Sequence, residues 1–98
     1  WVDGGDAATV DPAANSWVHV AFTVSATKAI LYLNGEPVKD ADLTGLSWAG
    51  CDILSIGSGA PRFPEWNHLS DESLIDELSI YNKVLTQAEI VDIMDFFN

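Results

Sequence analysis

Apolar and polar residues alternate in the first half of the chain, which predicts β-strands. The alternation is clearest over residues 18–24, where a period of two indicates a strand with one face in a core. The apolar set there is Val18, Val20, Phe22 and Val24. A second strand is predicted at 29–33, and Asn34-Gly35 after it favours a two-residue hairpin turn. The return strand should cover 36–39, and Pro37 indicates that this strand lies at an edge or begins there.

The second half of the chain predicts two further strands separated by a long connection. Residues 52–57 are a short apolar run, and Cys51 before it is expected to be a small buried residue. Residues 73–82 alternate again, with Asp76 on the same face as three aliphatic side chains. The connection between them is rich in Gly and Pro, and long loops in compact domains are often functional.

The hydrophobic period changes at the end of the chain. Thr86 and Glu89 have the spacing of a capping box, in which each side chain satisfies a backbone N–H at the start of a helix. Apolar residues then follow at helical spacing, so one helix is predicted from about Gln87 to Phe96. The predicted stripe is Ile90, Ile93, Met94 and Phe97. Short strands with a single terminal helix favour an all-β sandwich.

The hydrophobic content and the net charge of the chain limit which kinds of binding partner it can have. The chain has 98 residues, room for one domain, and 48% of them are hydrophobic, enough for a packed core. Its net charge of −11 disfavours nucleic acid and anionic membranes as partners, and no membrane-spanning segment is visible. We read the acidity mainly as a solvated surface, with cation binding as the alternative.

Two stretches resemble laminin-G-like domains of the concanavalin A-like lectin/glucanase superfamily. Residues 17–23 (WVHVAFT) and 30–35 (ILYLNG) are similar to a consecutive pair of strands in these domains. Residues 75–90 (IDELSIYNKVLTQAEI) are similar to their closing segment, and 54–57 (LSIG) to a strand between the two. The motifs occur in the family's order over most of the chain.

The resemblance implies a two-sheet antiparallel jelly-roll sandwich on a secreted or cell-surface protein. It also implies a mostly non-catalytic module that binds sugars or proteins. The first motif falls midway through a full domain, so residues 1–98 are expected to be the C-terminal part of an incomplete sandwich. The missing N-terminal strands would come from a partner chain, a second copy or an associated fragment, because a half-sandwich exposes apolar surface and strand edges.

A loop and a pair of strand residues are the candidate ligand sites. The loop offers aromatic faces for a sugar and hydrogen-bonding groups for its hydroxyls. Its candidate residues are Arg62, Phe63, Trp66, Asn67 and His68. The alternative is that the aromatic rings cap the core. His19 and Tyr32 could line a groove across the hairpin, or form a pair covered by another part of the fold, which we favour. Trp17 is expected to anchor the core.

Asp76 is the candidate metal ligand. A carboxylate on a core face needs hydrogen bonds or a cation, and domains that this chain resembles often hold a structural calcium. The favoured alternative is a carboxylate satisfied by backbone amides. A glycoside hydrolase is the least favoured function, because retaining hydrolysis needs two carboxylates about 5–5.5 Å apart. Glu72 and Asp76 share parity, but they are four residues apart and Glu72 precedes the predicted strand.

Overall fold

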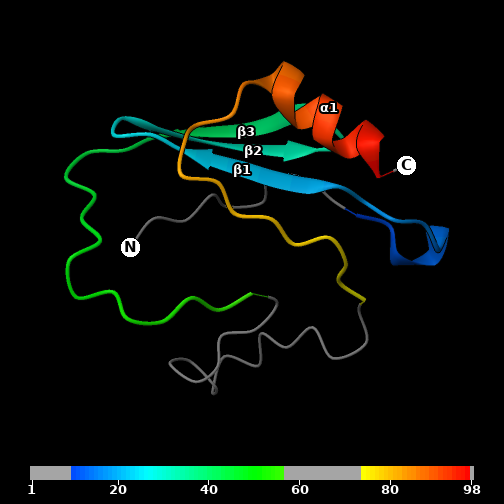
Figure 1. Cartoon of the computed structure of the whole chain (residues 1–98), viewed down its shortest axis with the longest axis horizontal. Coiled ribbons are helices and arrows are strands. Elements are labelled where there is room, and N and C mark those ends of the chain that lie inside the picture. Colours follow the sequence, from blue (N-terminus) through cyan, green and yellow to red (C-terminus); the bar gives the residue numbers. More distant parts are fainter. Residues whose placement is uncertain (1–9, 57–73, 98) are drawn as a thin grey trace. The chain divides into compact units, whose positions relative to one another are not determined.

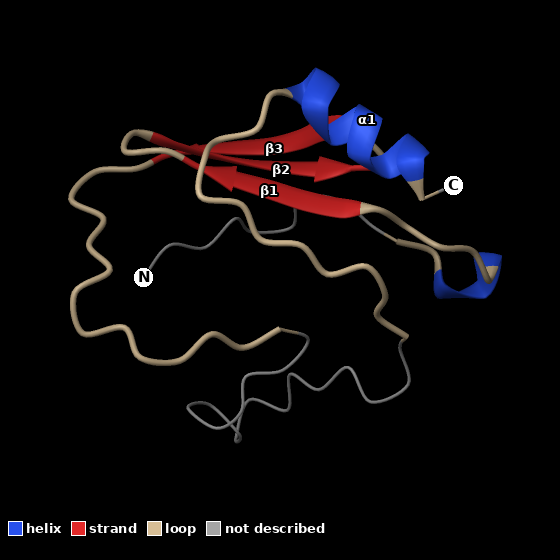
Figure 2. Ribbon diagram, in the orientation of Figure 1, coloured by secondary structure: helices blue, strands red, loops and turns tan. Residues whose placement is uncertain are grey.

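The computed structural model describes residues 10–56 and 74–97. Three strands form one antiparallel sheet in the order β1-β2-β3, with β2 in the centre (Figures 1 and 2). In chain order the elements are η1 (Pro12–Ala14), β1 (Val20–Val24), β2 (Lys28–Leu33), β3 (Glu36–Asp42) and α1 (Gln87–Phe96). The chain divides into two compact units, Trp1–Leu46 with Tyr81–Asn98, and Ser47–Ile80. All of these elements belong to the first unit.

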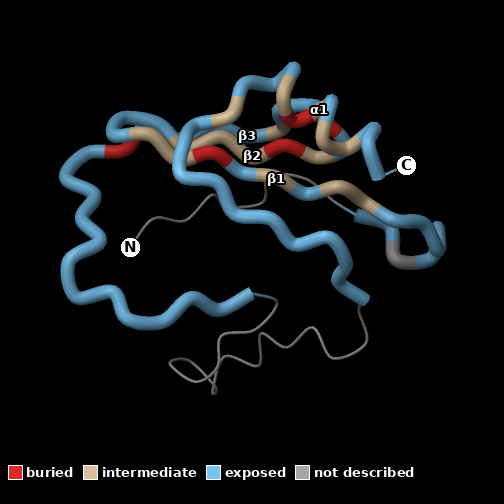
Figure 3. The backbone as a smooth tube through the Cα atoms, in the orientation of Figure 1, coloured by how far each residue is buried: buried red, intermediate tan, exposed pale blue. Residues whose placement is uncertain are grey.

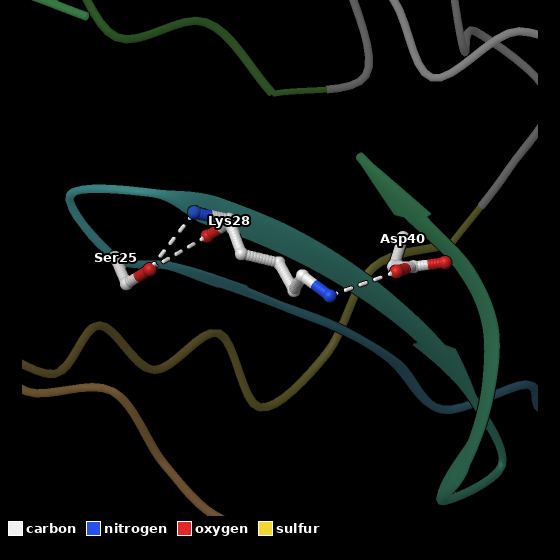
Figure 4. A network of polar contacts seen from close by, with 3 residues as sticks. All are labelled: Ser25, Lys28 and Asp40. Carbon is white, nitrogen blue, oxygen red and sulfur yellow. Dashed lines mark hydrogen bonds and ion pairs between the residues drawn. The ribbon is translucent and has the colours of Figure 1, made fainter. Parts of the chain in front are cut away.

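Ser25 closes the connection from β1 to β2. Its hydroxyl oxygen accepts a hydrogen bond from the backbone N–H of Lys28 at 2.9 Å (Figure 4) and one from the backbone N–H of Thr27 at 3.2 Å. The hydroxyl also lies 3.1 Å from the Lys28 carbonyl oxygen, to which it donates. Lys28 Nζ in turn contacts Asp40 Oδ2 on β3 at 3.1 Å, and this hydrogen bond raises the pKa of Lys28. Local side-chain bonds of this kind stabilise the turn without any contact to distant residues.

The predicted Asn34-Gly35 turn joins β2 to β3. Both residues adopt positive φ, 50° and 80°, as a two-residue hairpin of this type requires. The return strand is longer than predicted and extends to Asp42. The register shifts between Leu31 and Tyr32, because Leu31 pairs with Lys39 and Tyr32 with Pro37. Val38 is therefore an extra residue in β3, a β-bulge next to a proline.

The terminal helix has the predicted bounds and the predicted cap. Thr86 Oγ1 accepts a hydrogen bond from the Glu89 N–H at 3.2 Å, and Glu89 Oε2 accepts one from the Thr86 N–H at 2.9 Å. Ile90, the first residue of the apolar stripe, is 1% exposed. Helix α1 lies over the sheet, and Gln87 Nε2 donates to the Gly35 carbonyl oxygen at 3.0 Å. This hydrogen bond links the first residue of α1 to the hairpin turn between β2 and β3.

The cap makes the stability of α1 depend on pH. A 2.7 Å hydrogen bond from Lys83 Nζ lowers the pKa of Glu89, and the Thr86 N–H lowers it further. A carboxyl whose folded pKa is depressed stabilises the fold above its unfolded pKa, about 4.3. That stabilisation is lost as the pH falls through the lower folded pKa. We expect the urea midpoint, followed by circular dichroism, to fall between about pH 5 and about pH 3.

Glu89→Gln isolates this contribution. A glutamine at this position still accepts from the Thr86 N–H, but it does not titrate. The variant should show a shallower acid dependence than the parent chain, because the remaining carboxyls are common to both. The difference should be small, since the Lys83 and Glu89 side chains are both exposed. Superimposable pH profiles of the two proteins would contradict this account of the cap.

The sheet buries the face opposite to the one that the alternation predicted. Val20 and Phe22 were expected in the core, but they are 57% and 71% exposed. Thr23 on β1 and Tyr32 on β2 are the buried strand residues. The buried positions in Figure 3 fall in the sheet, in α1 and just beyond β3, where Leu43 lies. The reason is physical: alternation separates the two faces of a strand, whereas the segments that pack on the sheet decide which face is covered.

The two later strands are not formed in the described residues. Residues 51–56 and 74–82 contain no strand, and Cys51 is exposed rather than buried. Glu77 has a φ of 55°, which interrupts an extended backbone in the middle of the predicted strand. Alternation supplies an apolar face, but a strand also needs a neighbour for its N–H and C=O groups. The described aliphatic side chains of these segments are therefore exposed: Ile53, Leu54, Ile56, Leu74, Ile75, Leu78 and Ile80.

Candidate ligand-binding site

His19 and Tyr32 share a face of the sheet without being opposite one another. His19 faces Asn34: its N–H donates to Asn34 Oδ1 at 3.0 Å, and its carbonyl oxygen accepts from the Asn34 N–H at 2.8 Å. Tyr32 faces Ala21 instead. Since side chains of β-strands repeat every second residue, His19 is a diagonal neighbour of Tyr32. The alternation in the sequence therefore correctly predicted that His19 and Tyr32 lie on the same face of the sheet.

This face offers little surface to a ligand. Tyr32 is 6% exposed, so its ring belongs to the packed side of the sheet. His19 is half-buried, and its Nδ1 atom is buried without a hydrogen-bond partner in the part of the chain described. A buried polar atom in this state costs free energy. The burial of Tyr32 therefore favours the covered arrangement over an open groove.

The loop candidates fall outside the described residues. Arg62, Phe63, Trp66, Asn67 and His68 all lie within 57–73. Their role as a ligand-binding loop stays a prediction.

Asp76 is exposed, not buried on a core face. Its Oδ1 accepts a hydrogen bond from the Glu77 N–H at 2.9 Å, so a backbone amide satisfies part of the carboxylate. Within residues 10–56 and 74–97, no group of three or more His, Cys, Asp or Glu could hold a metal ion. Calcium takes six to eight oxygen ligands, so Asp76 alone could supply at most part of such a site. Calcium at this position stays a prediction that would need ligands from elsewhere.

Two exposed indoles were not among the candidates. Trp17, expected to anchor the core, is 66% exposed, and Trp48 is 67% exposed. Trp48 begins a tight turn in which its carbonyl oxygen accepts from the Cys51 N–H at 3.0 Å, and Gly50 has a φ of 79°. Flat exposed aromatic rings are the groups on which the apolar faces of sugars stack. The Gly-rich turn around Trp48 was the signal in the sequence, since side chains at a turn point outward.

The comparisons with known proteins agree with this fold. The sequence matches the model of the concanavalin A-like lectin/glucanases superfamily, in its laminin G form, over residues 1–91. The chain belongs to this superfamily. The resemblance read from the motifs at 17–35 and 75–90 is thereby confirmed. Comparison with curated proteins gives no match.

A solved structure of similar fold comes from Clostridium thermocellum. It is described as an S-layer domain-containing protein, is 25% identical to this chain and superposes with a TM-score of 0.69. The match covers 88% of this concanavalin A-like chain and 42% of the other. The chain therefore spans less than half of the length of that protein. In the described residues no helix is long and apolar enough to cross a membrane.

Proposed function

We propose that the chain is part of a non-catalytic, extracellular carbohydrate-binding or adhesion module with a two-sheet sandwich fold. Membership of the concanavalin A-like superfamily supports the sandwich and the class of ligand. The S-layer description of the structural neighbour supports a location at the cell surface. The observation that carries the proposal is the exposure of Trp17 and of Trp48, each of which offers an open aromatic ring on which the apolar face of a sugar can stack.

Glycan binding follows from this proposal. On a glycan array the chain should bind a restricted set of sugars, because an aromatic platform selects by the shape of the apolar sugar face. The tryptophan that contacts the glycan should be revealed by one of three variants: Trp48→Ala, Trp17→Ala or the loop variant Trp66→Ala. That variant should weaken glycan binding at least about tenfold, which is about 1.4 kcal/mol. Mass spectrometry of the bound glycans should show them uncleaved.

A matched control removes an equally open aromatic ring elsewhere. Phe96 on α1 is highly exposed, and Phe96→Ala should leave glycan binding unchanged. If no glycan binds, or if the three tryptophan variants all behave like the parent chain, the carbohydrate-binding function is wrong. Cleavage of a bound glycan would contradict the non-catalytic part of the proposal.

A second candidate function is a module that combines with a separate polypeptide. The observation in its favour is the apolar surface of β1, where Val20 and Phe22 are both exposed. Isolated exposed apolar residues are ordinary, whereas contiguous ones favour an interaction surface, and Val20 and Phe22 lie on the same face of one strand. This function does not depend on sugar binding, and the two can coexist in one module.

A further inference from the structure

The hairpin turn between β2 and β3 carries the one Asn-Gly pair of the sequence, Asn34-Gly35. Asparagine is a chemically labile residue, which loses ammonia when the backbone nitrogen of the next residue attacks its side-chain amide. A following glycine has no Cβ to hinder this attack. The residues that suit the turn are therefore also the pair most open to deamidation.

The reaction needs only groups of the turn and water. The Gly35 backbone nitrogen gives up its proton and bonds to Asn34 Cγ, while the Cγ–Nδ2 bond breaks and Nδ2 leaves with that proton as ammonia. Water then opens the resulting five-membered succinimide ring at one of its two carbonyls. Cleavage of the new N–Cγ bond gives aspartate at position 34. Cleavage of the original peptide bond gives isoaspartate, in which the main chain runs through the side chain.

The backbone of Asn34 holds the reacting atoms apart in the folded turn. Its φ of 50° lies in the left-handed region, where ψ is about +30° to +60°. Because Cα is tetrahedral, a ψ in this range turns Cβ nearly opposite to the Gly35 nitrogen across the Cα–C bond. The succinimide ring requires Cβ and this nitrogen on the same side of that bond. The ring therefore cannot close while the turn keeps this backbone.

Hydrogen bonds hold both residues of the turn in this conformation. Asn34 Oδ1 accepts from the His19 N–H at 3.0 Å, and the Asn34 N–H donates to the His19 carbonyl oxygen at 2.8 Å. The Gly35 carbonyl oxygen accepts from Gln87 Nε2 at 3.0 Å. The side chain that would be attacked is thus held by the residue before β1, and the attacking residue is held by α1.

Helix α1 also covers the attacking residue. Asn34 is exposed, whereas Gly35 is buried. A Cβ at Gly35 would lie 2.8 Å from Val91 Cγ2 and 3.5 Å from Met94 Cε, so the helix packs closely on this glycine. This packing restrains the rotation of the peptide unit between Asn34 and Gly35 that ring closure requires. Separation of α1 from the turn removes the restraint.

We propose that Asn34 is a deamidation site, which the folded turn keeps unreactive and which converts to aspartate and isoaspartate when α1 and the turn separate. The rate at Asn34 is then the rate of the open turn multiplied by the fraction of time for which the turn is open. Because ammonia leaves, each conversion is permanent. Modified Asn34 therefore accumulates as a record of the opening of this contact.

The two products have different effects on the sheet. Aspartate keeps a side-chain oxygen that can accept from the His19 N–H, so the turn is retained. Isoaspartate adds a methylene group to the main chain of a two-residue turn, which then no longer brings Leu33 opposite Glu36. Isoaspartate, and not aspartate, should therefore weaken the pairing of β2 with β3.

Mass spectrometry of the chain aged at mildly alkaline pH tests the proposal. Trypsin releases residues 29–39 as one peptide, since Lys28 and Lys39 bound this segment. Deamidation of Asn34 raises the mass of this peptide by the difference between an OH and an NH2 group. The folded chain should deamidate at least about tenfold more slowly than a synthetic peptide of residues 29–39, whose turn is always open. The chain unfolded in urea should react at the rate of the peptide.

Gln87→Glu isolates the contribution of α1. A charged glutamate has no N–H to donate to the Gly35 carbonyl oxygen, whereas an acidic side chain in the first turn favours the helix itself. The variant should deamidate roughly three- to tenfold faster than the parent chain, as expected for the loss of one hydrogen bond. The control is Ser25→Ala, which removes hydrogen bonds of the turn at the other end of β2. It should leave the rate at Asn34 within about twofold.

Specific outcomes overturn the proposal. Equal rates for the folded chain and the free peptide do so, as does a Gln87→Glu chain that reacts no faster than the parent. Equal acceleration in Ser25→Ala would show that the reaction follows opening of the whole sheet and not release of α1. Asn34→Asp should unfold close to the urea midpoint of the parent, whereas the isoaspartate form, separated by chromatography, should unfold at lower urea. An isoaspartate form as stable as the parent would contradict the effect assigned to this product.

Discussion

Gly35→Ala should destabilise the protein by about 3 kcal/mol, because two costs meet at one residue. Gly35 has a φ of 80°, in the left-handed region where a Cβ costs about 1–2 kcal/mol. An added Cβ would also lie 2.8 Å from Val91 Cγ2 on α1. Valine has one strongly preferred rotamer in a helix, so the clash would push the helix away from the turn, at about 1–3 kcal/mol. Urea unfolding followed by tryptophan fluorescence measures the loss.

Gly45 provides the matched control. It also has positive φ, 68°, but nothing lies within 4 Å of the position of its Cβ. Gly45→Ala should therefore cost only the backbone part, about 1 kcal/mol. Adding Val91→Ala to Gly35→Ala should recover about 1–2 kcal/mol as a coupling energy in a double-mutant cycle. Equal losses for Gly35→Ala and Gly45→Ala would show that α1 does not pack against the turn.

Ile90→Ala should lower the free energy of unfolding by about 3 kcal/mol, within the range of about 2–5 kcal/mol for a buried aliphatic truncation. Ile90 is the largest fully buried side chain among the described residues. Its truncation therefore leaves a cavity beneath α1. For a domain of this size the melting temperature should fall by roughly 15 °C. Differential scanning calorimetry measures both quantities.

The same substitution at an exposed isoleucine is the control. Ile80 is highly exposed, and Ile80→Ala should change stability by less than about 0.5 kcal/mol. Alanine is slightly the better helix former, which offsets only a few tenths of a kcal/mol of the Ile90 effect. An Ile90→Ala protein as stable as the Ile80→Ala protein would mean that α1 contributes nothing to the core.

Some of the candidate site could be predicted from sequence, and some could not. The shared face of His19 and Tyr32 followed from parity alone, because strand side chains repeat every second residue. The exposure of Trp17 did not, because it depends on what covers that position. Asp76 was placed on a predicted strand whose backbone is interrupted at Glu77. Side-chain spacing carries no information on whether a strand finds its neighbour.

The sequence by itself determined the features that depend on neighbouring residues along the chain. Asn34-Gly35 set the hairpin turn, Thr86 and Glu89 set the start of α1, and the motifs around them identified the superfamily. These features need only backbone preferences and hydrogen bonds within a few residues, which is why local patterns predict them.

Only the tertiary structure decided which face of the sheet is buried and which segments became strands. Phe22 is exposed and Thr23 is buried, the reverse of what hydrophobicity alone predicted. The two later alternating segments have no strand in their described residues. The physical reason is that a side-chain pattern fixes only the difference between two faces, whereas burial and strand pairing require surfaces and hydrogen-bond partners that come from distant residues or from another chain.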